Sequence, residues 1–137
     1  MSVNPSLINA IYTGGFGAAL FLTGGNLMFG ENAMTPYFAG PTSVWNEWTS
    51  RAFGGQLLAV ASGYFFGGKD ASSATGKMYN KVNCVAGTLM LPLMVYGAFS
   101  GEPTFNAMMW KFQIAVHIPV IYISYKAGFG SEGSKSA

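Results

Sequence analysis

Long runs of apolar residues, separated by short polar segments, dominate the chain. Four of these runs carry almost no charge, and their lengths suit a transmembrane helix, which needs about 17 to 25 residues. They predict helices over residues 7–29, 44–66, 82–99 and 105–125. Because the apolar residues lie in blocks rather than in short alternating strands, helices are favoured over a barrel. The pattern predicts an all-α fold, an integral membrane bundle of four transmembrane helices.

Composition agrees with this prediction. Half of the 137 residues are hydrophobic and 9% are charged, against about 25% charged residues in an ordinary soluble domain. A surface that faces water cannot be built from so few charges. We expect a single transmembrane domain over residues 1–126, followed by a disordered tail over residues 127–137. The net charge of +2 is small and scattered, so nucleic acid is not an expected partner.

The charged residues differ in sign between the two sets of connections. In a four-span chain the N-terminus, the second connection and the C-terminus share one side. That side holds two acidic residues against five lysines, Lys69, Lys77, Lys81, Lys126 and Lys135; the other side holds Arg51 against Glu31, Glu47 and Glu102. Because lysine and arginine in short connections mark the cytoplasmic side, or its stromal or matrix equivalent, we expect both termini there.

Two local patterns refine these helices. Glu47 and Arg51 stand four residues apart with the acid first, the better order for a helical ion pair, and we expect the pair near the membrane surface. Pro92 and Pro119 lie inside the third and fourth predicted spans. Each proline removes one backbone hydrogen bond, which predicts a kink.

Small residues recur along one stripe of the second span and, more weakly, along the first. The second stripe holds Gly55, Ala59, Gly63 and Gly67, and the first includes Gly14 and Ala18. A stripe without large side chains lets another helix approach closely. We therefore expect the first two spans to pack together, although the same faces suit a neighbouring subunit or a flat pigment ring.

His117, the single histidine, lies in the fourth span near the middle of the membrane. Gln113 and Ser124 share its face at helical spacing, and Asn106 extends this stripe. A polar residue at this depth faces protein, a ligand or water rather than lipid. We favour an interhelical hydrogen bond from His117, with Thr88, Asn83 or Gln56 as partner.

Two other roles remain open for His117, as axial ligand of a chlorophyll magnesium or as part of a proton relay. The candidate cofactor-binding residues are His117, Gln113, Gln56 and Asn83. Chlorophyll and carotenoid are the cofactors considered. One histidine cannot form a bis-histidine site, so no haem is expected.

Catalytic motifs do not appear in the chain. The complete Walker motif GxxxxGK[ST], HExxH, CxxC and GxSxG are all missing. The single Cys84 lies in an apolar run, where a small buried hydrophobe is its usual role. We therefore expect no enzymatic activity.

The stretch from Met34 to Gly68 contains an aromatic segment that leads into Trp48, Arg51 and a helix rich in small residues. This arrangement resembles small four-helix membrane proteins of algal plastids and DoxX-like families. The resemblance implies a four-helix membrane bundle and a plastid setting, and it supplies no catalytic residue.

These features together favour an accessory, structural subunit of a large energy-transducing membrane complex, with a photosystem or its antenna ahead of a respiratory complex. The expected partners are other membrane subunits and lipids, and a thylakoid membrane is favoured over the mitochondrial inner membrane. The alternatives are a small oligomeric transporter or channel lined by the stripe of His117, and a DoxX-like oxidoreductase component.

Overall fold

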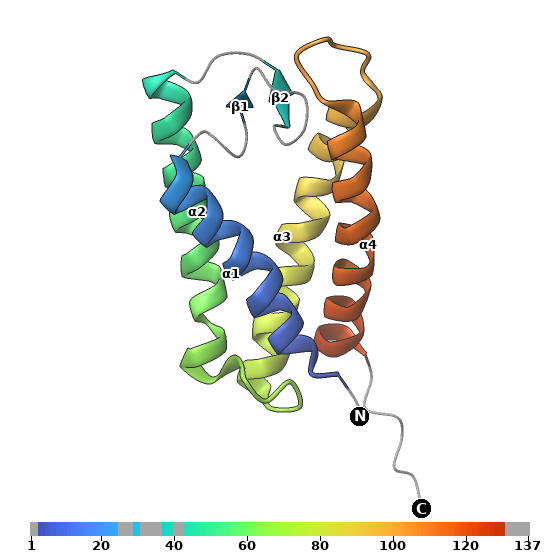
Figure 1. Cartoon of the computed structure of the whole chain (residues 1–137). Coiled ribbons are helices and arrows are strands. Elements are labelled where there is room, and N and C mark those ends of the chain that lie inside the picture. The colour runs from blue at the N-terminus through green and yellow to red at the C-terminus, as the bar shows by residue number, and fades with distance from the viewer. Residues whose placement is uncertain (1–2, 25–28, 31–36, 40–42, 131–137) are drawn as a thin grey trace, which may run out of the picture.

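A computed structural model describes residues 3–24, 29–30, 37–39 and 43–130. The described chain contains four long helices, which are α1 (Pro5–Thr23), α2 (Val44–Ser62), α3 (Ala74–Phe99) and α4 (Ala107–Phe129) (Figure 1). The smaller elements are the two-residue strands β1 (Phe29–Gly30) and β2 (Phe38–Ala39), which pair in parallel, and the π-helical segment η2 (Tyr64–Gly68). The prediction of a helical chain with four long helices is confirmed.

Polar caps set where these helices begin. The side chains of Asn4, Ser43, Ser73 and Asn106 each accept a hydrogen bond from a backbone N–H in the first turn of the helix that follows. Such a cap satisfies one of the amides that have no partner inside the helix. Because Ser73 caps α3, that helix begins eight residues before the predicted position 82 and includes Lys77 and Lys81, which the prediction placed in a connection.

The helix ends also differ from the prediction. α1 ends at Thr23 rather than at position 29, because Gly24 follows with a φ of 62°, a left-handed conformation that glycine adopts easily. α2 ends at Ser62, and its continuation is η2, where Gly67 has a φ of 110°. α4 runs to Phe129, past the predicted domain end at position 126. The rest of the predicted tail, residues 131–137, lies outside the described residues.

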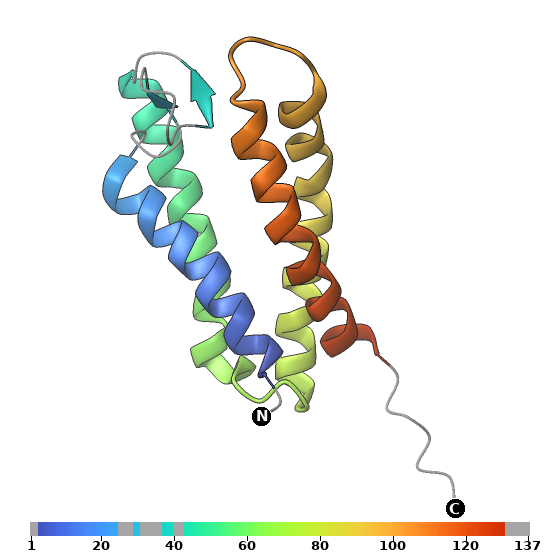
Figure 2. The same cartoon turned by 45° about the vertical axis from the view of Figure 1, so that its right-hand side comes forward.

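The helices form two pairs, α1 with α2 and α3 with α4, and most contacts between helices lie within a pair. Figure 2 shows the two pairs side by side. The start of α1, η2 and the end of α4 lie at one end of the bundle, and β1 and β2 lie at the other (Figure 1). At the first end, Asn4 joins the start of α1 to the connection between η2 and α3 by donating to the carbonyl of Lys69 at 2.9 Å.

The contact between α1 and α2 depends on two glycines. A Cβ atom on Gly54 would lie 2.7 Å from the carbonyl oxygen of Gly17 and 2.6 Å from the amide nitrogen of Phe21. A Cβ atom on Gly14 would lie 3.2 Å from the side-chain methyl of Ala61. The predicted packing of these two helices is therefore confirmed, with backbones in direct contact.

The residues that make this contact differ in part from the predicted stripes. Gly55 faces the ring of Phe21 at ordinary distance, and Ala59 is exposed. Gly63 packs against Tyr79 of α3, and Gly67 lies near Thr75, so neither faces α1. Ala18 is half-buried. The stripe of α2 that faces α1 begins at Gly54 rather than Gly55, because one residue turns a helix by about 100°.

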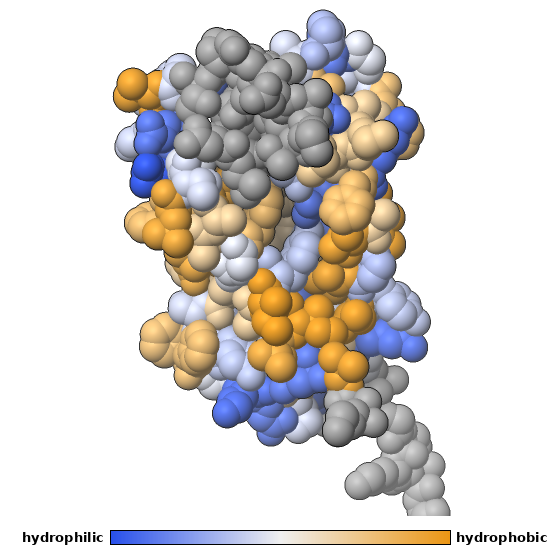
Figure 3. All heavy atoms as spheres, viewed as in Figure 1, coloured by the Kyte–Doolittle hydropathy of each residue, from blue (hydrophilic) through white to orange (hydrophobic). Residues whose placement is uncertain are grey.

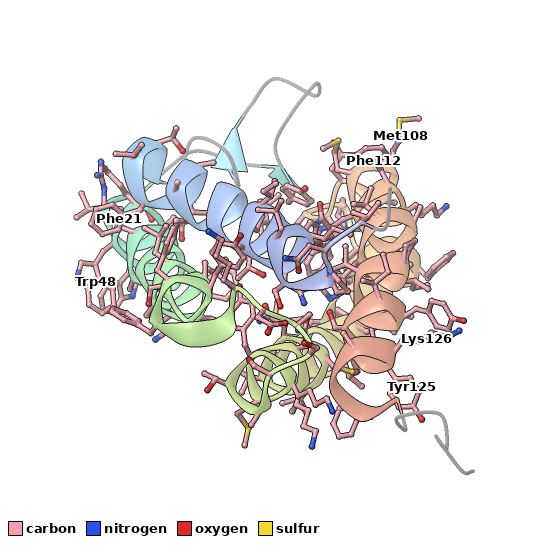
Figure 4. The ribbon with its side chains drawn as sticks, turned by 90° about the horizontal axis from the view of Figure 1, so that it is seen from below. Phe21, Trp48, Met108, Phe112, Tyr125 and Lys126 are labelled. Carbon is pink, nitrogen blue, oxygen red and sulfur yellow. The ribbon has the colours of Figure 1, made fainter. Side chains whose placement is uncertain are left out.

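The bundle buries many polar side chains and exposes many large apolar ones. Of the five largest side chains with almost no exposure, only Leu20 is apolar; the others are Ser6, Asn9, Asn80 and Ser124. Phe21, Trp48, Met108 and Phe112 point away from the bundle in Figure 4. Orange, hydrophobic surface covers much of the face in Figure 3. A domain that folds in water has the opposite distribution.

Two of the helices, α1 and α3, are long and apolar enough to cross a membrane. Their charged residues agree with this. α1 has no charged residue, and the lysines of α3 lie among its first eight residues. Pro92 and Pro119 lie inside α3 and α4, and each helix continues through its proline.

Gly54→Ala should lower the free energy of unfolding by about 1 to 3 kcal/mol, because the new methyl group has to push α1 and α2 apart. Gly55→Ala is the matched control, since its methyl group would meet only the ring of Phe21, at 3.7 Å. The control should be neutral or stabilise the helix by up to about 1 kcal/mol. Thermal unfolding followed by circular dichroism measures both changes. Equal effects of the two substitutions would contradict the described contact.

Candidate functional site

One face of α1 carries polar side chains that bond to the other helix pair. Ser6, Asn9 and Thr13 follow one another at spacings of three and four residues, which places them on the same side of a helix. Tyr12 lies beside Thr13 on this face. Each of these four side chains hydrogen-bonds to α3 or α4. We call these residues and their partners Asn80, Asn83, Gln113, His117 and Ser124 the polar seam.

The end of the seam near the start of α1 is a cluster of four side chains with 0% exposure. Asn9 donates to the carbonyl oxygen of the Asn80 side chain at 2.8 Å, and Asn80 donates to the hydroxyl of Ser6 at 2.8 Å. The hydroxyl of Ser124 donates to the side-chain oxygen of Asn9 at 2.8 Å. Buried amides and hydroxyls are costly unless paired, and here each has a protein partner.

The other end of the seam is a continuous chain of hydrogen bonds. Tyr37 donates to Oε1 of Gln113 at 2.6 Å, and Nε2 of Gln113 donates to the hydroxyl of Tyr12 at 2.6 Å. The Tyr12 hydroxyl lies 2.7 Å from Nδ1 of His117, whose Nε2 lies 3.0 Å from the carbonyl oxygen of Gly87. A carbonyl only accepts, so Nε2 carries the hydrogen, and in a neutral ring Nδ1 then accepts from Tyr12. All donors in this series of hydrogen bonds thus point in one direction, from Tyr37 toward Gly87.

This geometry defines what His117 can bind. Both ring nitrogens have protein partners, and the lone pair on Nδ1 is directed at Tyr12. A magnesium ligand needs a ring nitrogen with a free lone pair, so His117 would have to release Tyr12 to act as one. The residues therefore do not fit an axial ligand in the described arrangement.

The hydrogen bond of His117 is interhelical as predicted, but the predicted partners are wrong. Thr88 donates to the carbonyl of Cys84 within its own helix. Asn83 accepts from Thr13 at 3.1 Å and donates to the carbonyl of Tyr79. Gln56 is exposed on the outer face of α2, because that face lies opposite the contact with α1. Of the candidate cofactor-binding residues, Gln113, His117 and Asn83 are thus brought together, and Gln56 is not.

A cavity of about 110 Å³ lies beside the seam, between the two helix pairs. Its polar wall includes Tyr12, Asn83, Gln113 and His117, and the rest of its lining is mostly apolar. Phe53, Leu57 and Val60 of α2, Met90 and Met94 of α3 and Val120 and Ile121 of α4 supply much of the apolar wall. The face in Figure 3 is hollowed between the two helix pairs.

An aromatic cluster closes the end of the cavity near β2. The ring of Tyr37 packs edge-on against Trp110 at 4.9 Å between centroids, and Phe16 packs on its other side at 6.1 Å. The indole of Trp110 donates to the carbonyl of Tyr37 at 3.0 Å. Burial raises the pKa of Tyr37, which keeps its hydroxyl protonated as the first donor of the chain. The side chain of Tyr37 is therefore buried within the bundle.

Charged residues stay away from the seam. No Asp, Glu, Lys or Arg is buried in the part of the chain that the structure describes. The predicted ion pair is confirmed, with Arg51 and Glu47 at 2.7 Å, and Arg51 also donates to the carbonyl of Phe21. In the connection before α3, hydrogen bonds from Ser72 lower the pKa of Asp70. Over the same described residues, no three His, Cys, Asp or Glu side chains gather as metal ligands would.

Two parts of the site are missing from the sequence-based prediction, the polar face of α1 and the role of Tyr12. The prediction treated the first span as an apolar packing helix. The signal was present as uncharged polar residues at positions 6, 9 and 13, which repeat at the spacing of a buried stripe. Asn80 and Asn83 of α3 show the same spacing of three.

Comparison with known protein families, curated proteins and solved structures finds no match to this chain. The resemblance over residues 34–68 therefore stays a prediction. Arguments about function rest on the polar seam, the cavity and the surface of the bundle.

Tyr12→Phe should lower the free energy of unfolding by about 1 to 3 kcal/mol, because it leaves Gln113 and His117 without their shared partner. Tyr79→Phe is the matched control, since the Tyr79 hydroxyl is buried and is the one buried side-chain polar atom of the described residues with no protein partner. Its loss should change stability by less than about 0.5 kcal/mol or increase it. Thermal unfolding compares the two variants. If Tyr79→Phe lowered the free energy of unfolding as much as Tyr12→Phe, the hydrogen bonds assigned to Tyr12 would be refuted.

Proposed function

We propose that this protein is a structural subunit that crosses a membrane with four helices and packs against larger subunits of a membrane complex. The observation that carries the proposal is the inversion of polarity. The interior holds paired amides and hydroxyls, while Leu22 is 73% exposed, Leu89 70% and Met108 79%. Hydrocarbon stabilises such a surface, and polar side chains inside a bilayer turn toward one another.

The lengths of α2 and α4 support four crossings rather than two. They have 19 and 23 residues, or about 28 and 34 Å at 1.5 Å per residue, against a hydrocarbon core of about 30 Å. Each packs mainly against an apolar partner, α2 against α1 and α4 against α3. The charged residues of α2, Glu47 and Arg51, lie in its first two turns, where they reach the interface.

The two ends of the bundle support an orientation. Lys69, Lys77 and Lys81 lie at or near the end that holds η2 and the start of α1, and Lys126 lies in the last turn of α4 at the same end. Glu47, Arg51 and Glu102 belong to the opposite end. By the rule that short cytoplasmic connections are rich in lysine and arginine, both termini face the cytoplasm or its organelle equivalent.

The closed polar seam supports a structural role rather than transport. Of the four residues considered for the lining of an oligomeric pathway, Gln113, His117 and Ser124 face α1 of the same chain and bond to it. A conduction pathway through them would first have to break these bonds. Their donors and acceptors instead hold one helix pair to the other.

The outer surface supports contact with partner subunits and lipid. Trp45 and Trp48 stack at 5.5 Å between centroids near the start of α2, and both are exposed. Aromatic residues of this kind lie at the headgroup level. The sequence resemblance favours a photosystem or its antenna as the complex. Pigments such as chlorophyll or carotenoid would then contact these outer faces rather than His117.

Membranes from cells that express the full chain test this proposal. After an alkaline carbonate wash the protein should remain in the membrane pellet. In mild detergent it should migrate in a native gel with an assembly several times larger than its own 14.5 kDa, and in SDS it should migrate alone. Release by carbonate would refute the membrane placement. A lone chain in mild detergent that conducts ions in liposomes would refute the structural role.

A further inference from the structure

We propose that the cavity between the two helix pairs binds a ring-sized apolar molecule, or the ring-sized end of a longer one, that carries one hydrogen-bond-accepting oxygen such as an ether or a ketone. This inference goes beyond the structural role and needs only the folded bundle. Three observations carry it, which are the volume of the cavity, the donors in its wall and the position of its mouth.

The volume fits a single ring. The cavity measures about 110 Å³, and an engineered apolar cavity of about 150 Å³ is known to hold benzene. A pigment macrocycle of several fused rings is too large for this space. Because apolar side chains such as Leu57, Val60 and Met90 supply most of the wall, the main part of the ligand has to be apolar.

The wall also offers hydrogen-bond donors that the seam does not use. A carboxamide nitrogen carries two hydrogens. Nε2 of Gln113 uses one on Tyr12, and Nδ2 of Asn83 uses one on the carbonyl of Tyr79. Both side chains are buried and line the cavity. Among the described residues the remaining hydrogen of each has no acceptor, so the chemical group that this part of the wall still lacks is an accepting oxygen.

The mouth of the cavity faces the apolar exterior. Ala86 of α3 lines the cavity and is exposed, while α2 has few contacts with α3. The geometry therefore places an opening between α2 and α3, where the outer surface includes exposed residues such as Leu89. A ligand dissolved in lipid can enter here without crossing water, and a longer tail can remain outside.

Trp110 provides a direct readout, because it lines the cavity. In a Trp45→Phe, Trp48→Phe background, where both exposed tryptophans are removed, Trp110 is the single tryptophan. The full chain in lipid nanodiscs is titrated with bromocyclohexane, whose bromine quenches the indole. The proposal predicts saturable quenching, reversed by tetrahydropyran at about one tenth of the bilayer concentration that cyclohexane requires. The two competitors have rings of the same size and differ by one oxygen.

Val60→Phe should fill the cavity and abolish the saturable phase. Val85→Phe is the matched control, because Val85 is exposed on the outside of α3, and it should leave quenching unchanged. If Val60→Phe fails to keep its helical circular dichroism, Ala86→Leu at the mouth replaces it. Quenching that rises linearly in every variant would overturn the binding site. Equal competition by cyclohexane and tetrahydropyran would overturn the accepting oxygen. Either result leaves the membrane placement and the structural role standing, since the carbonate and native-gel measurements test those separately.

Discussion

The hydrogen bonds of the polar seam are the constraint on which the rest of the bundle depends. Apart from the contact of η2 with α3, the seam and the aromatic cluster around Tyr37, the two helix pairs have few contacts with each other. In hydrocarbon, apolar burial gives little drive for helices to associate, and packing and polar pairing take over. The seam therefore fixes how the pair of α1 and α2 sits on the pair of α3 and α4, and it keeps the cavity between them from collapsing.

Within each pair a different interaction applies. Gly17 and Gly54 bring two backbones into contact, which needs no polar side chain. Between the pairs, long side chains such as those of Tyr12, Gln113 and His117 bridge a wider gap. Close packing on one side and bridging on the other leave space between the pairs. The same separation that requires the seam thus creates a volume for a ligand, with unused donors of the seam in its wall.

The sequence was sufficient for much of the fold and for part of the site. Charge-free runs predict four helices, and the spacing of Gln113 and His117 correctly places them on one buried face. Helix ends depend on single capping residues such as Ser73, which a hydropathy pattern does not weigh. The partner of His117 is Tyr12, 105 positions away in the chain, and tyrosine in an apolar run reads equally well as an interfacial or a buried residue. The packing of α1 against α4 is what shows that Tyr12 is directed into the bundle and bonds to His117.

Labelling from within the lipid phase tests the central claim most directly, that this bundle pairs polar side chains inside and meets hydrocarbon outside. The full chain in nanodiscs is exposed to a lipid-soluble diazirine, irradiated and mapped by mass spectrometry. The account predicts carbene adducts at Leu89, Leu93, Phe112 and Ile118, which are all exposed, and none at the buried Leu20. Adducts at Leu20 with none on the outer residues, or no adducts on the helices at all, would contradict it.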